Sequence, residues 1–177
     1  MGLEYLESWK RSLPICVKKE IFSVEGNRFV LEEKGSGSSY KFNVICQLDS
    51  TLIKLCPSKM KENTKYLKRQ PNDCDYILID LELQIIFYIE LKNDSKSSKP
   101  DEIKSQLESG KYWLQHLCFL IGFEIDFSEF EIFKVCCKQK GKIEIDGRGN
   151  RPSQSDKGYY IKSGKIIDLR CFYRMCK

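Results

Sequence analysis

Three side chains that can do chemistry together, Asp75, Glu90 and Lys92, lie within one short stretch of this sequence. Two carboxylates held about 5 Å apart repel each other, and both are costly to bury in apolar surroundings. A divalent cation between them removes that repulsion, and a hard cation such as Mg²⁺ takes few, close oxygen ligands and keeps several of its waters. Lys92 can then contact one of those waters or a substrate phosphate. The residue types therefore indicate metal-dependent chemistry on a phosphate.

A β-hairpin over residues 72–92 is the element that would bring the two acids together. Apolar, β-branched and aromatic residues form two runs, 76–79 and 85–91, on either side of a short polar break. This pattern is typical of a hairpin. Folding the stretch about its midpoint places Asp75 directly opposite Glu90. Because side chains alternate between the two faces of a strand, Glu90 and the lysine two residues later share one face.

An acid and a lysine two residues apart are not specific by themselves. The same spacing recurs at Glu32-x-Lys34, Asp94-x-Lys96 and Glu102-x-Lys104. Only the pair at 90 and 92 ends a buried strand with an acid in register across a hairpin. The structural alternative is a salt-bridged hairpin end, at which the lysine neutralises two acids. Because buried ion pairs roughly break even at best, we favour a functional site.

The stretch resembles the PD-(D/E)xK nuclease superfamily, and in particular its small, stand-alone restriction-endonuclease-like members. The likeness rests on Cys-Asp-Tyr-Ile-Leu-Ile at 74–79, Phe-Tyr-Ile-Glu-Leu-Lys at 87–92 and Gln-Leu-Glu-Ser at 106–109. It covers about residues 40–137. Cys74 stands where the family pattern has proline, which leaves a choice between Asp73 and Asp75 as the metal ligand. We take Asp75, because it opens the apolar run and has the right hairpin register.

The resemblance implies a nuclease that depends on Mg²⁺, with Mn²⁺ as a substitute. Asp75, Glu90 and the Leu91 carbonyl would hold the metal, which would lower the pKa of its bound water and offset charge on the phosphate. Lys92 would orient the water or stabilise that charge. In the family a glutamine at the position of Gln106 often completes the pocket, and an exposed helix glutamine is the equally weighted alternative. The resemblance implies a nucleic-acid substrate. We expect first a DNA endonuclease that acts in restriction, defence or repair.

We expect a single α/β domain over residues 1–177, with a nuclease-like core at about 40–137 and a basic C-terminal extension at about 141–177. The resemblance implies a restriction-endonuclease-like core, a central mixed β-sheet flanked by helices on both faces, in the order α-β-β-β-α-β. A helix is predicted from an N-cap at Ser98 to Gly122, because apolar residues recur at four- and three-residue spacing. These residues are Ile103, Leu107, Gly110, Leu114, Leu117 and Ile121.

The remaining pattern predicts further short elements around this core. They are a helix over residues 3–12, strands over 27–33, 40–48, 51–55 and 127–137, a surface helix or loop over 57–71, and a second hairpin over 159–172 that turns at Ser163-Gly164.

The charge distribution is compatible with a polyanionic partner. The chain has a net charge of +5; residues 54–69 hold six basic side chains against one acid, and residues 141–177 hold nine against four. A nucleic acid would thus meet two basic flanks around an acidic pocket. We predict that Lys96, Arg148, Arg151 and Lys157 contact it, although a single lysine is more often ordinary solubilising surface.

Composition excludes several other classes. No run approaches 18 consecutive apolar residues, and the N-terminus lacks the apolar core of a signal peptide, so we expect no membrane span and no membrane partner. The nine cysteines contain no Cys-x-x-Cys pair and His116 is the only histidine, which argues against a zinc site. We interpret the cysteines as reduced thiols of a cytoplasmic protein.

Three functional classes stay open on the sequence alone: a DNA endonuclease, a nuclease-like fold used only for binding as an inactive subunit of a larger complex, and an RNA nuclease. The intact set of Asp75, Glu90 and Lys92 argues against the second. The sequence does not separate DNA from RNA. The short chain leaves little room for a recognition domain, so a homodimer or another protein is expected to supply specificity.

Overall fold

The computed structural model describes residues 9, 11–13, 17–35, 38–62, 71–93, 99–123, 125–139 and 152–176. They form an α/β structure with a mixed seven-stranded sheet in the order β1-β4-β5-β6-β7-β9-β8 and a three-stranded sheet in the order β10-β3-β2. The strands of the large sheet are β1 (Phe22–Glu25), β4 (Leu52–Leu55), β5 (Tyr76–Asp80), β6 (Ile85–Lys92), β7 (Glu131–Lys138), β8 (Ser153–Gln154) and β9 (Tyr160–Ser163). Those of the small sheet are β2 (Arg28–Gly35), β3 (Ser38–Ile45) and β10 (Ile166–Asp168).

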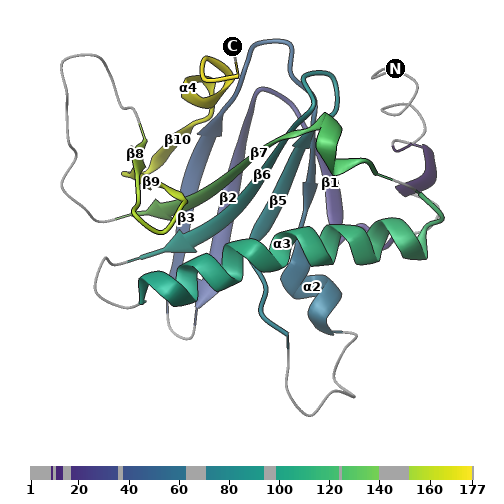
Figure 1. Ribbon diagram of the computed structural model, residues 1–177, viewed down its shortest axis with the longest axis horizontal. Helices are drawn as coiled ribbons and strands as arrows, with labels where there is room; N and C mark the ends of the chain where they lie inside the picture. Colours follow the sequence, from purple (N-terminus) through teal and green to yellow (C-terminus); the bar gives the residue numbers. More distant parts are fainter. Residues whose placement is uncertain are drawn as a thin grey trace.

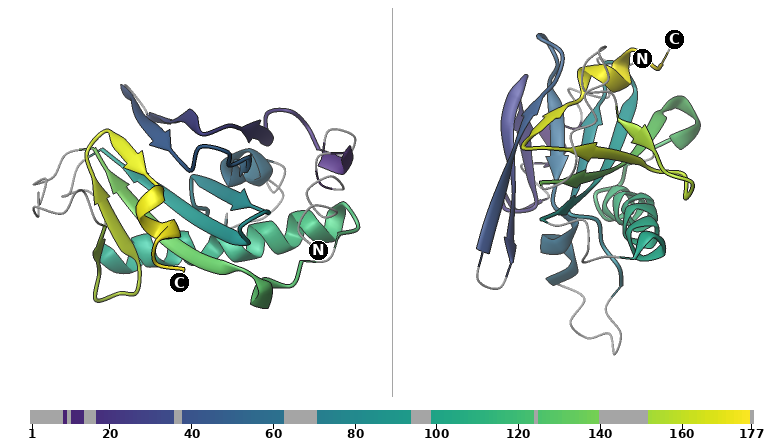
Figure 2. Two further views of the ribbon diagram at one scale, coloured as in Figure 1. Left: turned by 90° about the horizontal axis from the view of Figure 1, so that it is seen from above. Right: turned by 90° about the vertical axis from the view of Figure 1, so that its left-hand side faces the viewer.

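These elements stack in three layers (Figures 1 and 2). The long helix α3 (Pro100–Leu120) lies across one face of the large sheet, and the small sheet lies against the other. Shorter helical segments are α2 (Pro57–Lys61), the 3₁₀ turn η2 (Phe127–Glu129) and α4 (Arg170–Tyr173). The layering leaves two apolar cores, one on each face of the large sheet.

The central hairpin has the predicted register. Strands β5 and β6 are antiparallel, and Tyr76 pairs with Ile89. One further step along this ladder places Asp75 opposite Glu90. Strand β6 also pairs in parallel with β7, so it is central in the sheet and seven of its eight residues are buried. That burial explains why its sequence is a continuous apolar run rather than an alternating one.

Helix α3 is the crossover between the parallel strands β6 and β7. The predicted apolar face is confirmed: it is buried against the sheet, with Ile103, Leu107, Gly110, Leu114 and Leu117 among its buried residues. The helix begins at Pro100 with Lys99 as N-cap, one residue later than predicted, because proline suits the first helical position, where its missing N–H costs nothing. Gly122, with φ of 70°, follows the end of the helix as predicted.

The second face of the large sheet differs from the prediction of helices on both faces. It is covered by the small sheet together with α4. The alternating strands β2 and β3 turn Phe29, Leu31, Phe42 and Val44 inward, and Phe172 of α4 joins the same core. A hairpin with alternating apolar residues can bury its apolar face on a sheet as an amphipathic helix does, and here the β2–β3 hairpin takes the place of the expected helices.

The predicted hairpin over 159–172 is wrong. Strand β9 pairs in parallel with β7, whereas β10 pairs in parallel with β3, so the two strands belong to different sheets. The chain passes from one sheet to the other at Gly164, whose φ is 101° and whose N–H donates to the Lys138 carbonyl at 2.9 Å. A short alternating run predicts a strand but not its partner.

Most of the other short elements are confirmed. The predicted strands over 27–33, 40–48 and 51–55 correspond to β2, β3 and β4, and α2 occupies the start of the 57–71 segment. The strand expected from residue 127 begins at Glu131, because η2 precedes it. Of the predicted N-terminal helix, Trp9 and residues 11–13 are helical, while residues 1–8 lie outside the described part of the chain.

The composition also led to predictions about membrane spans and about the cysteines. Among the helices in the described ranges, none is long and apolar enough to cross a membrane. The eight cysteines in those ranges are free thiols.

Candidate active site

Asp75 and Glu90 lie opposite each other where strand β5 begins and strand β6 approaches its end. The Asp75 Oδ2 atom accepts a hydrogen bond of 2.6 Å from the backbone N–H of Leu91. Glu90 is only 2% exposed, and Asp75 is half-buried. The hairpin therefore brings together the two carboxylates that its sequence pattern predicted.

Lys92 completes this group on the same face of β6. Its Nζ atom lies 2.5 Å from Glu90 Oε1, and its side chain is 15% exposed. The other oxygen of the carboxylate, Glu90 Oε2, is buried and has no hydrogen-bond partner among the described residues. A buried acceptor left without a donor is costly. This oxygen is therefore available to a ligand.

Burial changes the protonation of both acids. It raises the pKa of the Asp75 carboxyl well above its ordinary value, and the charges of Glu90 and Glu33 raise it further, while the Leu91 amide and Lys92 oppose the rise. Burial also raises the pKa of Glu90 from 4.5 to about 7, against the opposing effect of Lys92. For Lys92, burial alone would lower the pKa, but the adjacent Glu90 and Asp75 raise it above 10.5. Raised pKa values at two neighbouring buried acids are more common at functional sites than elsewhere in a protein.

Asp73, the alternative to Asp75, has a different partner. Its Oδ1 atom lies 2.6 Å from the Nζ atom of Lys61 at the end of α2. Asp75 instead bonds to the strand that carries Glu90. The geometry thus favours Asp75 as the acid that acts together with Glu90.

The part of helix α3 from Ser105 to Trp113 contacts the chain that leads into Asp75. The indole N–H of Trp113 donates to the Asn72 carbonyl at 2.8 Å, and the Asn72 side-chain amide donates to Ser105 Oγ at 2.7 Å. The helix lies close to β6 at Gly110, where an added Cβ would lie 2.5 Å from Cδ1 of Tyr88. This close approach requires glycine.

Gln106 lies one helical turn before Gly110, and Glu90 lies two strand residues after Tyr88. One turn of helix spans about 5.4 Å and two strand residues about 6.6 Å. Since α3 runs back along β6, these steps place Gln106 at the level of Glu90. The Gln106 Oε1 atom is buried and has no hydrogen-bond partner among the described residues. It is thus a second unpartnered acceptor at this end of the helix.

Sequence reasoning missed two residues of the β2–β3 hairpin, Glu33 and Tyr40. They are paired across the hairpin, and the Tyr40 hydroxyl donates to the Glu33 carboxylate. The hairpin is held near the site because the Tyr76 hydroxyl donates to the Glu32 carbonyl at 2.5 Å. Glu33 accordingly contributes to the raised pKa values of both Asp75 and Glu90. The sequence offered only two adjacent acids in an alternating strand, which is not a specific signal.

The oxygen atoms at this site are of the kind that binds a small hard cation. Mg²⁺ is usually bound through one or two carboxylates together with waters and substrate phosphate. Asp75 and Glu90 supply two carboxylates, and within the described ranges no group donates a hydrogen bond to Glu90 Oε2. Since the N–H and C=O of one strand residue point to the same side, the Leu91 carbonyl faces the Asp75 side as its N–H does. Within the described ranges, no three His, Cys, Asp or Glu side chains form a group that could hold a metal by themselves.

The predicted nucleic-acid contacts are mostly outside the described residues. Lys96, Arg148 and Arg151 fall in the segments 94–98 and 140–151, which the structure does not describe. Lys157 is described, and its Nζ atom lies 3.0 Å from Asp101 Oδ1 in the first turn of α3. It therefore lies at the same end of the helix as Gln106. His116, for which no catalytic role was predicted, is exposed.

Comparison with known proteins yields no relative: no family model, no curated protein and no solved structure matches the chain. The resemblance to PD-(D/E)xK nucleases therefore stays an expectation from the sequence motif.

Proposed function

We propose that this protein is a metal-dependent nuclease with a restriction-endonuclease-like core, which hydrolyses phosphodiester bonds in DNA. One observation carries the proposal: Glu90 is buried opposite Asp75, with one carboxylate oxygen on Lys92 and the other without a hydrogen-bond partner in the part of the chain that the structure describes. A purely structural salt bridge would satisfy both oxygens, because an unpaired buried acceptor costs about 1–3 kcal/mol. A site that receives a cation leaves one free.

In this proposal Asp75, Glu90 and the Leu91 carbonyl hold the metal. When bound, Mg²⁺ supplies Lewis-acid activation of water and neutralises charge on the phosphate. The Leu91 N–H orients the Asp75 carboxylate from the back. Burial keeps bulk water away from Glu90, so that charges in the site act more strongly than they would in solvent.

Lys92 orients the attacking water or stabilises the charge that develops on the phosphate. Its ammonium group is held at 2.5 Å by Glu90, and its pKa is raised, so that it remains protonated at neutral pH. A fixed cation of this kind lowers the barrier because its position costs no reorganisation during the reaction. Gln106, whose Oε1 has no hydrogen-bond partner among the described residues, is the helix residue that would complete the pocket.

Nucleic acid is the substrate because the site is acidic and its flanks are basic. Lys61 at the end of α2 pairs with Asp73, and Lys157 pairs with Asp101 in the first turn of α3. The basic character of the flanks comes from the excess of lysine and arginine over acids in residues 54–69 and 141–177. A polyanion held by these flanks would bring its phosphates to the cation between Asp75 and Glu90.

The test is a cleavage assay on linear, circular and branched DNA and on RNA, with Mg²⁺, with Mn²⁺ and with chelator. We expect cleavage of at least one DNA substrate that stops when the metal is chelated. Cleavage of RNA alone would replace DNA by RNA as the substrate. No cleavage of any substrate, together with retained binding, would make the protein an inactive nuclease-fold subunit.

A further inference from the structure

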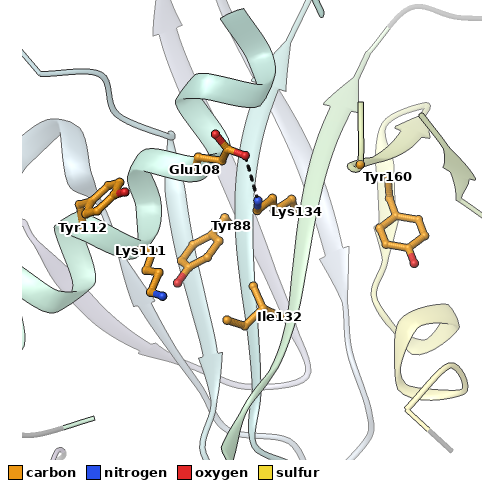
Figure 3. A pocket seen from close by; sticks show the side chains of 8 residues that line it. Tyr88, Glu108, Lys111, Tyr112, Ile132, Lys134 and Tyr160 are labelled. Atoms are coloured by element: carbon orange, nitrogen blue, oxygen red, sulfur yellow. Dashed lines mark hydrogen bonds and ion pairs between the residues drawn. The ribbon is translucent and has the colours of Figure 1, made fainter. Parts of the chain in front are cut away.

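An open hollow of about 680 Å³ lies beside helix α3, on the β7 side of the helix. It is lined by residues of β6, β7, α3 and the turn that leads into β9, among them Tyr88, Lys111, Tyr112 and Lys134 (Figure 3). The hollow exists because one helix covers only part of a seven-stranded sheet. Its volume is within the range of pockets that bind small molecules.

Tyr88 places a polar group without a partner at this hollow. The residue is 1% exposed, and its hydroxyl is buried with no hydrogen-bond partner among the described residues. Burial raises the pKa of the Tyr88 hydroxyl, so that it remains a neutral donor at every working pH. A buried donor of this kind is costly until an acceptor reaches it.

Two lysines from different elements line the same hollow. Lys134 of β7 lies 3.4 Å from Glu108, and Lys111 of α3 lies over the ring of Phe127 with its Nζ atom 5.3 Å from the centroid. The lysines thus outnumber the single lining carboxylate, Glu108, as Figure 3 shows. An anion that enters the hollow would meet two ammonium groups, and that of Lys134 would exchange a partly buried pair with Glu108 for the anion.

Tyr112 provides an aromatic face at the outer edge of the hollow. Its side chain is 70% exposed although it lies on the helix that covers the sheet. Exposed aromatic rings of this kind serve as platforms on which nucleic-acid bases stack, worth about 1–3 kcal/mol per base. An aromatic platform, two cations and a buried hydroxyl donor together match the parts of a nucleotide.

The hollow is also close to the acid pair. Tyr88 and Glu90 project from the same face of β6, two residues apart, which is about 7 Å along the strand. On the neighbouring strand, Tyr88 is in register with Lys134. A nucleic-acid strand with a phosphate at Glu90 can therefore place a neighbouring nucleotide in the hollow.

We infer that this hollow binds one unpaired nucleotide of the substrate strand, next to the phosphate that is cleaved at Glu90. The base stacks on Tyr112, the phosphate lies between Lys111 and Lys134, and the Tyr88 hydroxyl donates to an acceptor on the nucleotide. A hollow that admits a single base selects strands with an unpaired segment, such as ends, flaps or branches. The identity of the ligand as nucleic acid rests on the proposed nuclease function.

The test measures binding without cleavage. Glu90→Gln protein, in chelator, is titrated with a fluorescent single-stranded oligonucleotide and with a blunt duplex of the same length. Tyr88→Phe, which removes only the hydroxyl, should weaken single-strand binding about ten-fold. Tyr112→Ala should weaken it by about ten-fold or more, while Phe119→Ala, which removes another exposed aromatic ring of α3, should leave it unchanged.

A thermal melt separates this effect from misfolding. Without ligand, Tyr88→Phe should have an equal or higher Tm, because it removes a buried donor that has no partner. Unchanged single-strand affinity in both Tyr88→Phe and Tyr112→Ala would overturn the inference, as would equal losses on the blunt duplex. If those variants weaken binding but no substrate is cleaved by the wild type, the hollow is a nucleotide site and the nuclease proposal alone fails. If the wild type cleaves DNA but Tyr88→Phe and Tyr112→Ala bind single strands as the wild type does, the nucleotide site is wrong and the nuclease proposal stands.

Discussion

The backbone N–H of Leu91 donates a hydrogen bond of 2.6 Å to the carboxylate of Asp75. The strand that carries one acid of the site therefore fixes the position of the other. A slip of one residue in the hairpin would turn every side chain to the opposite face, so the acid pair exists only in this register.

Asp75→Asn should remove most of the metal binding. The amide loses the charge that a cation neutralises, so we expect Mn²⁺ affinity to fall by about 10²-fold or more, measured by titration calorimetry. Asp73→Asn is the matched control, since Asp73 pairs with Lys61 instead. Binding that is lost in Asp73→Asn but kept in Asp75→Asn would identify the other aspartate as the ligand. No heat from the wild type, with nucleic acid present or absent, would leave Lys92 as the only counter-ion.

Glu90→Gln and Lys92→Ala should each reduce cleavage by about 10²-fold or more, a typical loss for a group that stabilises charge in the transition state. Both variants should still fold: glutamine keeps the shape of Glu90, and without Lys92 the buried acid can take up a proton. Glu32 and Glu102 have the same acid-x-lysine spacing elsewhere in the chain. As controls, Glu32→Gln and Glu102→Gln should keep wild-type rates of cleavage. Equal losses from these two controls would show that the assignment is wrong.

The stability of the metal-free protein should fall as pH rises from about 4.5 to about 7. In that window the unfolded chain loses the proton that Glu90 keeps in the folded state, so the stabilisation present below pH 4.5 disappears by the folded pKa of about 7. The free energy of unfolding should drop by up to about 3 kcal/mol, since one pKa unit corresponds to about 1.4 kcal/mol. Denaturation by urea in chelator at several pH values measures this. The slope should flatten in Glu90→Gln, and an identical slope there would contradict the prediction.

Gly110→Ala should destabilise the fold even though alanine is the better helix former. The new methyl group would lie 2.5 Å from the Tyr88 ring and 3.0 Å from Cys74 Sγ. Overpacking of this kind costs about 1–3 kcal/mol, which exceeds the gain of up to about 1 kcal/mol in helix propensity. Gly26→Ala is the control, because nothing lies within 4 Å of its added Cβ. A Tm for Gly110→Ala at or above that of the wild type would mean that α3 can move away from β6 without cost.

Removing the basic groups at 148, 151 and 157 should weaken nucleic-acid binding and reduce its dependence on salt. Each lost duplex phosphate contact lowers the slope of log K against log salt by about 0.9. The triple variant Arg148→Ala, Arg151→Ala, Lys157→Ala should therefore show a shallower slope, while its Tm changes little because the Lys157 pair with Asp101 is exposed. Binding would be measured by fluorescence anisotropy at several salt concentrations. An unchanged slope would make this segment ordinary surface.

The hairpin and the helix could be predicted because each has a strong local pattern. Two apolar runs around a polar break gave the β5–β6 register, and the four- and three-residue spacing gave the buried face of α3. From that register the opposition of Asp75 and Glu90 followed directly. These features depend on residues close in sequence, where alternation and helical period determine the outcome.

Features that depend on distant partners could not be predicted. Strand β10 pairs with β3 instead of β9, and the sequence of β10 gives no sign of that choice. Glu33 reaches the site because the β2–β3 hairpin packs on the large sheet and the Tyr76 hydroxyl donates to the Glu32 carbonyl, which are contacts between segments far apart in the chain. The covering of the second face by a sheet likewise depended on which surface the β2–β3 hairpin met.

The two apolar cores also differ in their optical properties. Both tryptophans of the chain, Trp9 and Trp113, are buried on the α3 side of the large sheet. The core between the two sheets holds tyrosine and phenylalanine but neither tryptophan. Tryptophan emission during unfolding therefore reports directly on one layer only. A curve that appears two-state by fluorescence says nothing about separate opening of the β2–β3 layer, which carries Glu33, until circular dichroism or hydrogen exchange follows the same transition.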